Sequence, residues 1–473
     1  MSYGVRDLLK FALPLVASSV AMTLDSLVGT FCLSHSSDVA LRAALPAAAL
    51  AGTFTTVATA FLGYAGTVVA THHGFGRERL AVHSFVQGLW LFALTAVLFA
   101  GAGPVGRLLL ARFGHAQDVL AAETAYLNLL LAAGSLQALA VVLASFFIGR
   151  GLTRLPGAAL LSGSFVNMVL TPILVLRLGF GIEGAGWSRI IAAAVPCIFL
   201  AGAVLRDPLI ARPQARAGVM RFMPALAHEL LQLAAPNALR LLVDFGGFFL
   251  LTALIGALDG LSASVSTAVF AVTGLYCAVL RGVSSGVEIR VAQEISHAES
   301  TRRIVLDAFR LMAFVLAAFL AFLFAAGDFC VTRFLSQTPT PDPAAADTAI
   351  RTLFLILIPR EALETVQQIL MAALRGRGET LRLLRIQAVV TCLCWLPLLF
   401  ALRTFAPSLN AYWLSTLVYM SSSALLLLRA IRSRRTESAS AVLARTPIRR
   451  VSGPVSAACP FRDRSGSRRR ASA

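Results

Sequence analysis

Charged residues are scarce in this sequence. Only 14% of its 473 residues are charged, whereas 58% are hydrophobic. A soluble domain needs about a quarter of its residues charged to cover its surface, so the composition excludes a soluble enzyme or binding domain. The apolar residues form continuous runs of roughly 20, the length that a helix needs to cross the hydrocarbon core of a bilayer. These runs do not alternate with polar residues, which argues against a membrane β-barrel.

Acidic residues are scarcer than basic ones, and the formal net charge is +18. This excess could suggest nucleic-acid binding, but its distribution argues otherwise. Residues 429–473 hold twelve arginines against Glu437 and Asp463, and the other basic residues stand in short segments between apolar runs. Basic residues beside membrane spans set topology or contact anionic lipid head groups. We therefore expect the lipid bilayer as a partner, and no nucleic acid.

Cysteines are few and scattered. Most of the seven lie inside apolar runs, and none has metal-ligand spacing with a histidine. We interpret them as small buried apolar side chains. The sequence also lacks a phosphate-binding loop of the GxxxxGK[ST] type. It therefore predicts no cofactor, no metal centre and no ATP-driven work, so that energy for transport would come from an ion gradient.

Twelve apolar runs divide the chain. Basic residues gather in alternate segments between the runs, on the side that also holds both termini. The positive-inside rule makes this side cytoplasmic, so we predict a multi-pass protein of the cell (inner) membrane with cytoplasmic N- and C-termini. The predicted spans are 8–30, 43–71, 81–111, 123–149, 156–178, 184–205, 226–256, 262–288, 304–335, 346–373, 381–402 and 407–430.

The predicted fold class is an all-α polytopic membrane protein with twelve transmembrane helices in two pseudo-symmetric six-helix lobes. We expect an N-terminal lobe at 1–205, a cytoplasmic inter-lobe loop at 206–225 and a C-terminal lobe at 226–431. Residues 432–473 are expected to form a basic, disordered cytoplasmic tail, because they contain too few apolar residues to form a core.

The two halves share a short motif at equivalent places. The sequence GRGLT at 149–153 recurs as GRGET at 376–380, and each copy follows an apolar run on the predicted cytoplasmic side. This match indicates two bundles repeated in the same orientation. Parallel repeats of this kind usually flank a central substrate path.

Charged residues inside predicted spans are candidates for functional sites, because burying a charge in a bilayer is costly. Asp244 lies in the seventh run, eight residues after Pro236, and Arg240 stands one turn before it. Their i, i+4 spacing allows the two side chains to pair. Two interpretations stay open, namely a cation or proton site and a structural ion pair.

The tenth run carries a polar stripe. Arg360 and Glu364 share a helix face, and Glu361 and Gln367 stand close by. Such a stripe must face a cavity or partner helices rather than lipid. By the offset of the repeat, Glu364 corresponds to Gln137, so only the second half carries an acid at this position.

Two further acids, Asp25 and Glu288, stand in predicted spans. Asp25 is the lone acid of the first run, and both a cavity-facing role and a purely hydrogen-bonded role stay open for it. Glu288 and Arg290 lie near the cytoplasmic end of the eighth run. We expect these two side chains to snorkel to the membrane interface.

Several segments, in their order and spacing over about residues 8–430, resemble one known family. They are ALP at 12–14 with TLDSLVGT at 23–30, GFGR at 74–77, NMVLTP at 167–172, GVEIRV at 286–291, and LRG at 374–376 with ET at 379–380. Together they resemble the multidrug and toxic compound extrusion (MATE) family, and most its NorM-type branch.

The resemblance implies antiport of small amphipathic, often cationic, organic compounds against sodium or protons. Asp244 and Glu364 fall at the acidic positions of the family's seventh and tenth helices, which implies a cation-coupling role and a possible sodium site. The family's acids of the first and fifth helices fall at Gly29 and Thr171. Asp25, one turn before Gly29, would have to substitute for the first of these.

Arginines near the expected cation site suggest a departure from the family. Arg360 stands where an aromatic residue often assists that site, and Arg240 precedes Asp244 by one turn. We hypothesise that these two arginines act as built-in counter-ions, which would leave no place for sodium. The residues expected to line the substrate cavity or to modulate the site are Arg240, Arg360, Glu361, Gln367, Gln137 and Asn167.

The sequence therefore predicts a secondary active multidrug exporter that works as a monomer by alternating access. The alternative is a lipid-linked oligosaccharide flippase of the same superfamily, which the arginines at 240, 281 and 360 keep open. A membrane enzyme acting on lipids would need paired acids or a nucleophile near an interface, but Asp342 and Asp347 are isolated. A non-transporting receptor has no support beyond the basic tail.

Overall fold

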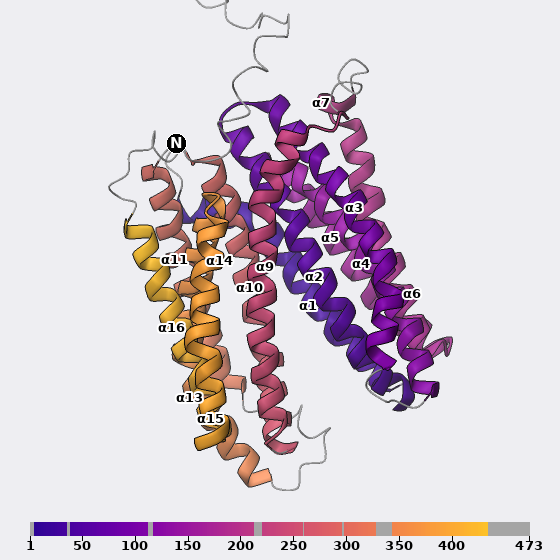
Figure 1. Ribbon diagram of the computed structural model, residues 1–473, viewed down its shortest axis with the longest axis vertical. Coiled ribbons are helices and arrows are strands. Elements are labelled where there is room, and N and C mark those ends of the chain that lie inside the picture. Colours follow the sequence, from indigo (N-terminus) through magenta and orange to yellow (C-terminus); the bar gives the residue numbers. More distant parts are fainter. Residues whose placement is uncertain are drawn as a thin grey trace, which may run out of the picture.

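The computed structural model describes residues 4–35, 38–111, 117–211, 220–258, 260–295, 298–327 and 343–433. Within these ranges the chain forms long helices that run roughly parallel to one axis (Figure 1). The predicted tail beyond residue 433 and residues 212–219 of the predicted inter-lobe loop lie outside the described residues. A short helix, α7 (Pro208–Ala211), precedes the undescribed part of that loop.

The N-terminal half supplies the first six long helices. The fifth of them, α5, ends in a π-helical segment, η1. The elements are α1 (Val5–Ser34), α2 (Asp38–Gly74), α3 (Glu78–Ala111), α4 (Gln117–Gly149), α5 (Arg154–Pro172), η1 (Ile173–Arg177) and α6 (Gly181–Arg206).

The C-terminal half supplies six more. Its third helix also ends in a π-helical segment, η2, and its fifth is interrupted by another, η3. The elements are α9 (Pro224–Gly256), α10 (Gly260–Gln293), α11 (Ala298–Phe322), η2 (Leu323–Gly327), α13 (Pro343–Gly376), α14 (Thr380–Val389), η3 (Val390–Trp395), α15 (Leu396–Phe405) and α16 (Leu409–Ser433).

The described ranges thus hold twelve long helical rods, which confirms the predicted fold class. Ten of them are long and apolar enough to cross a membrane. The two others are α10 and α13. Helix α13 carries Arg360, Glu361 and Glu364 in its middle, whereas the charged residues of α10 begin only at Arg281.

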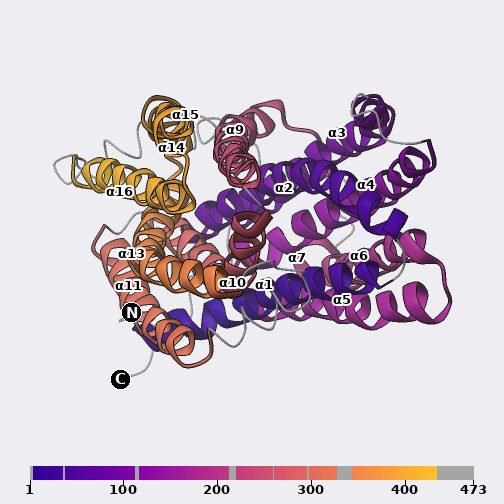
Figure 2. The same cartoon turned by 90° about the horizontal axis from the view of Figure 1, so that it is seen from below.

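The two halves form separate lobes that meet along a boundary. In the end-on view, α3 to α6 lie on one side and α11 to α16 on the other (Figure 2). The boundary is formed by α1 against α10 and by α2 against α9 and α10. Gly282 of α10 makes this packing possible, since a Cβ there would lie 2.5 Å from the Cα of Val16 on α1.

The repeated motif folds in the same way in both lobes. Gly151 ends the fourth helix at φ +85° and Gly378 ends the tenth at φ +75°, a conformation that favours glycine. In each copy the glycine N–H donates to the carbonyl three residues earlier, and the next N–H donates to the carbonyl five residues earlier, at 2.9–3.0 Å. The two lobes therefore share local turn geometry as well as helix order.

The lobes touch at one end of the bundle and spread apart at the other (Figure 1). The contacting end, called here the closed end, holds the start of α1 and the end of α16; the opposite end is called the open end. Near the closed end, Tyr64 Oη donates to the Arg375 carbonyl at 2.6 Å, and Gln293 Nε2 donates to the Gly149 carbonyl at 2.9 Å. Both bonds join the two lobes.

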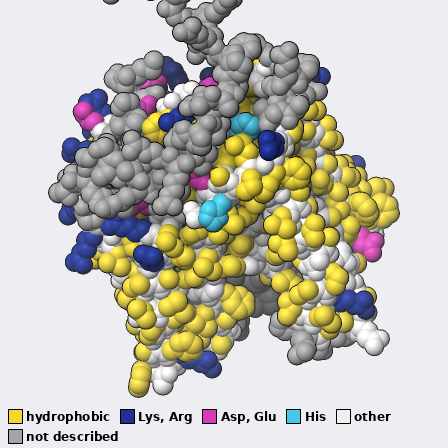
Figure 3. Space-filling model, turned by 45° about the horizontal axis from the view of Figure 1, so that its top comes forward, with side chains coloured by type: hydrophobic (Ala, Val, Ile, Leu, Met, Phe, Trp, Pro, Cys, Tyr) yellow, Lys and Arg dark blue, Asp and Glu magenta, His cyan; other side chains and the backbone are white. Residues whose placement is uncertain are grey.

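The outer flanks of the bundle are predominantly hydrophobic (Figure 3). Ile198, Phe249 and Phe314 are each about three-quarters exposed on long helices. Large apolar side chains so exposed on a helical bundle belong against lipid chains rather than water. The chain is a multi-pass membrane protein.

Candidate transport site

A cavity of about 700 Å³ lies between the two lobes. Residues of α1, α2 and α4 line it from the N-terminal half, and residues of α9, α10, α13 and α16 line it from the C-terminal half. Cavities of a few hundred to about 1,000 Å³ are typical of sites for small organic molecules. Because both lobes contribute walls, a rocking motion of the lobes would change its shape.

Arg240 and Asp244 of α9 form an ion pair at the wall of this cavity. Arg240 is only 5% exposed, and its Nη1 donates to Asp244 Oδ2 at 2.5 Å. The pairing expected from the i, i+4 spacing is therefore present. Pro236 stands one turn before Arg240 in the same helix, where its missing N–H leaves a backbone carbonyl without its helical donor.

The second oxygen of Asp244 also has partners. Asp244 Oδ1 accepts hydrogen bonds from the Tyr419 hydroxyl at 3.1 Å and from Gln387 Nε2 at 3.5 Å. The network continues through Ser423, which donates to Gln387 Oε1 at 2.6 Å and accepts from Gln367 Nε2 at 3.0 Å. The carboxylate of Asp244 is thus held by side chains from α9, α14 and α16.

Arg360 of α13 lies between two carboxylates. It donates to Glu361, which is fully buried, and its Nη2 lies 3.7 Å from Glu364 Oε2. Glu364 Oε1 also accepts a hydrogen bond from Gln368 at 3.1 Å. Arg360 is hypothesised above to be the counter-ion of Glu364; the two side chains do pair, but the nearer partner of Arg360 is Glu361. The longer separation leaves Glu364 the more loosely held acid of the cavity.

Glu288 lies inside the closed end rather than at the membrane interface, so the expected snorkelling is wrong. Its Oε1 accepts from Thr67 of α2 and its Oε2 from Nε of Arg375, both at 2.7 Å. Arg290 likewise turns inward, with its guanidinium 4.1 Å from the ring centroid of Phe11 on α1. Thr67 and Arg375 satisfy the carboxylate of Glu288 within the protein, so this side chain need not reach water.

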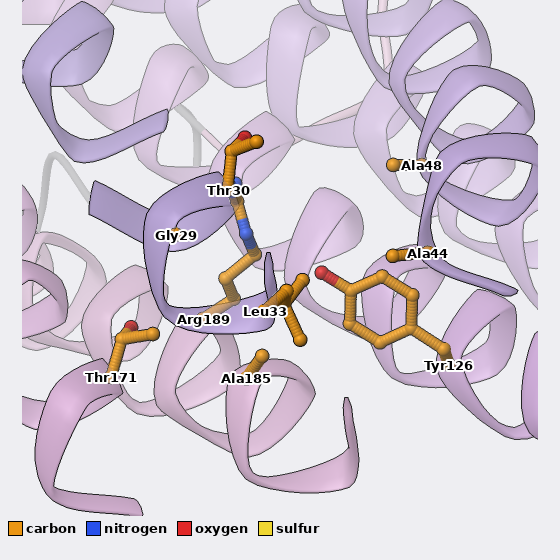
Figure 4. Close-up of a pocket in the computed structure, with 9 residues that line it drawn as sticks. All are labelled: Gly29, Thr30, Leu33, Ala44, Ala48, Tyr126, Thr171, Ala185 and Arg189. Carbon is orange, nitrogen blue, oxygen red and sulfur yellow. The ribbon is translucent and has the colours of Figure 1, made fainter. Parts of the chain in front are cut away.

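The N-terminal lobe holds a separate, smaller cavity of about 80 Å³ (Figure 4). Arg189 of α6 extends toward Gly29 and Thr30 of α1, and a Cβ on Gly29 would lie 3.6 Å from its Nη2. A guanidinium group therefore approaches the position where the family's first-helix acid would stand. Tyr126 and Thr171 also line this small cavity.

Asp25 lies beside this cavity in a chain of hydrogen bonds. Its Oδ1 accepts from Asn167 Nδ2 at 2.6 Å, Asn167 Oδ1 accepts from Thr171 at 3.2 Å, and Thr171 and Ser188 share a hydrogen bond of 2.8 Å. Arg189 is close enough to act on Asp25 through its charge. The structure thus brings Asp25 and Asn167 together, but away from Asp244 and Glu364.

Comparison with known proteins decides the family. The MatE family model matches residues 14–173 and 236–400. The chain belongs to the MATE family. A relative named probable multidrug resistance protein NorM, from Xylella fastidiosa strain 9a5c, is 25% identical over 302 residues, which are 62% of this chain and 64% of the relative. The same protein from strain Temecula1 matches to the same extent.

Solved structures share the fold of this MATE chain. A MOP superfamily transporter from Pyrococcus furiosus, described as having a binding pocket of reversed polarity, superposes with a TM-score of 0.82. A multidrug resistance MATE transporter in an outward-facing conformation gives 0.81. Each is 17% identical and covers 93% of this chain and 97% of its own. MATE proteins are ion-coupled antiporters of small organic compounds and not enzymes.

Some residues of the polar clusters in this MATE chain were not predicted from the sequence. Arg189 is a charge inside the sixth predicted span, so the criterion that selected Asp244 should have selected it too. Gln387 and Tyr419 are uncharged residues in otherwise apolar runs, and only the fold shows that they meet Asp244. Gln137 is half-buried on α4 and lines neither of the two cavities described above.

Proposed function

We propose that this MATE transporter is a secondary active exporter of small amphipathic organic compounds, driven by antiport against a cation gradient. The observation that carries the proposal is the cavity between the lobes, with apolar walls and with Asp244 and Glu364 both on its C-terminal side. A hydrophobic wall binds the body of an amphipathic compound, and the two acids bind the coupling cation. Compound and cation then compete for one space.

Alternating access requires the closed end to open. There, Thr67 and Tyr64 of the N-terminal lobe hold Glu288 and Arg375 of the C-terminal lobe by hydrogen bonds of 2.6–2.7 Å. These bonds break when the lobes rock and re-form when they return. With both termini in the cytoplasm, as the distribution of basic residues favours, the described state faces outward. We further propose that one chain in the cell membrane suffices, since both walls of the cavity come from it.

The proposed coupling ion is the proton rather than sodium. Sodium needs several free oxygen ligands and no fixed cation nearby, but both oxygens of Asp244 are already occupied and Arg240 lies 2.5 Å away. A proton needs only one carboxylate oxygen. Protonation of Asp244 would release Arg240 and alter the hydrogen bonds to Tyr419 and Gln387, which gives the two protonation states different packing across three helices.

A lipid-linked oligosaccharide flippase is the second candidate. The arginines along the cavity favour it, because they suit a phosphate-bearing substrate. The match to the MatE model over both halves of the chain favours the exporter instead.

The test is transport by the purified full chain in liposomes with an imposed pH or sodium gradient. Rhodamine B and its ethyl ester serve as amphipathic probes. We expect movement of at least one dye to follow the pH gradient and not the sodium gradient. Asp244→Asn and Glu364→Gln should each abolish that movement while inserting normally. Normal transport by both variants, or movement that ignores both gradients, would contradict the proposal.

A further inference from the structure

The central cavity has more arginines than acids in its lining. Its described lining residues include four arginines and three acidic residues. Three of the arginines each have a carboxylate partner: Arg240 with Asp244, Arg360 with Glu361 and Glu364, and Arg375 with Glu288. The fourth is Arg281 of α10.

Arg281 differs from the other three in its surroundings. Its side chain is exposed, whereas Arg240 and Arg360 are each no more than 5% exposed. Its Nη2 donates to Thr23 Oγ1 of α1 across the lobe boundary, at the long distance of 3.4 Å. Among the described residues it forms no ion pair with an acid. Its guanidinium therefore keeps most of its donors available to a bound molecule.

The residues around Arg281 form a polar strip with apolar sides. Cys277 and Ser285 stand one turn before and one turn after it on α10, and Ser19 faces the same cavity from α1. Apolar groups complete the walls, among them Leu15, Met22, Phe245, Phe248 and Leu280. The cavity thus combines one guanidinium without a carboxylate partner among the described residues, small hydroxyl groups and a large apolar surface.

A charged residue that lies between transmembrane helices and faces a cavity is a candidate for contact with the transported compound. Arginine binds planar oxyanions with two parallel hydrogen bonds, which makes it the preferred partner for carboxylate, sulfonate and phosphate groups. Since the described part of the protein does not supply such a group to Arg281, the transported compound is its natural source.

We propose that Arg281 binds an anionic group of the substrate, so that this transporter exports organic compounds carrying a carboxylate or sulfonate on an apolar body. The proposal rests on the exporter function proposed above and narrows its substrate class. Glu364, held by Arg360 only at 3.7 Å, leaves room for a cationic group at the other side of the cavity. A zwitterionic compound therefore fits, whereas a compound with only a positive charge would leave Arg281 without a partner.

The test uses two dyes that differ in one group. Rhodamine B carries a free carboxylate, and its ethyl ester has the same cationic ring system with the carboxylate blocked. Isothermal titration calorimetry on the purified full chain in detergent measures the Kd of each dye for wild type, Arg281→Gln and Arg281→Lys. Arg403→Gln, which removes an exposed positive charge at the end of α15, is the matched control. Transport of both dyes by the wild type in liposomes is measured in parallel.

Wild type should bind rhodamine B about tenfold or more tightly than the ester, as expected for one charge-assisted pair in a partly desolvated site. Arg281→Gln should weaken rhodamine B binding by about the same factor and change ester binding by less than about threefold. Arg281→Lys should restore part of the preference, and the control should match wild type. The thermal melting temperature should not change, because Arg281 makes one long contact.

A wild type that prefers the ester, or an Arg281→Gln variant that weakens both dyes equally, would overturn the proposal. If the ester is nevertheless transported along the pH gradient, the exporter function stands and only the substrate class is wrong. If neither dye moves, the exporter function is contradicted together with the inference that rests on it.

Discussion

The two lobes repeat one hydrogen-bond pattern but differ in its electrostatics. In each lobe an acid of the first helix accepts a hydrogen bond from an amide of the fifth: Asp25 from Asn167, and Asp244 from Gln387. In the C-terminal lobe the acid is also paired directly with an arginine, and it lines the cavity of about 700 Å³. In the N-terminal lobe the cluster borders a cavity of about 80 Å³.

This difference indicates that the two halves of a duplicated fold can serve different functions. The N-terminal cluster is enclosed and hydrogen-bonded in a chain, as a cluster that stabilises helix packing would be. The C-terminal cluster faces the space that a substrate would occupy. Its carboxylates are paired with arginines, which a bound cation would replace. Coupling between cation and substrate needs differential binding in one space. Among the described acids, Asp244 and Glu364 line the large cavity and Asp25 does not, which supports the proposed coupling in the C-terminal lobe.

The largest expected effect contrasts the same change in the two lobes. Asp244→Asn should lower dye transport driven by a pH gradient by about a hundredfold or more. The change removes the carboxylate that, in our proposal, either pairs with Arg240 or binds the coupling proton. Asp25→Asn should retain at least about half of wild-type transport. Initial rates in liposomes with equal amounts of reconstituted protein give the comparison. Equal losses in both variants would break the proposed division of tasks.

A smaller effect is expected from removing the built-in cation of the tenth helix. Arg360→Ala combined with Glu361→Gln leaves Glu364, which lines the cavity, without a paired cation, and it avoids leaving the fully buried Glu361 as an unpaired charge. We expect this double variant to gain a response to sodium, with transport rising about two- to fivefold when a sodium gradient is added. Glu361→Gln alone is the control, and it should not respond. A wild type that already responds to sodium as strongly as the double variant would refute the counter-ion hypothesis.

The smallest effect concerns stability. Asn167→Ala should lower the free energy of unfolding by about 1–2 kcal/mol, since it leaves a half-buried carboxylate without its donor. Transport per folded molecule should stay near the wild-type rate. Gln387→Ala, the equivalent change in the C-terminal lobe, should reduce stability by a similar amount and also slow transport. Thermal melting in detergent, measured beside liposome transport, separates the two effects. Loss of transport in the Asn167 variant without a change in melting would argue against a structural role.

Much of the fold followed from the sequence because membrane spans leave a strong signal. Continuous apolar runs, alternating basic segments and the repeated GRG motif predicted twelve helices in two lobes. The site was predicted less completely. Charges inside spans such as Asp244 and Glu364 stand out, and neighbours at i, i+4 such as Arg240 can be inferred from helix geometry.

Partners from distant helices could not be predicted in this way. Thr67 and Arg375 meet Glu288 only because α2, α10 and α13 converge at the closed end, and no pattern in one sequence encodes that convergence. This is why Glu288 was wrongly expected at the interface. Similarly, Arg360 has Glu361 as its nearer partner because side-chain direction, not sequence spacing alone, decides which acid it reaches.

The most direct measurement of the central claim is proton release on substrate binding. Rhodamine B is added to purified protein in weakly buffered detergent solution, and the pH change is recorded for wild type, Asp244→Asn and Asp25→Asn. If the C-terminal lobe couples protons to substrate, wild type and Asp25→Asn release protons on binding, and Asp244→Asn releases far fewer. Release that persists in Asp244→Asn and disappears in Asp25→Asn would place the coupling in the other lobe and contradict the account.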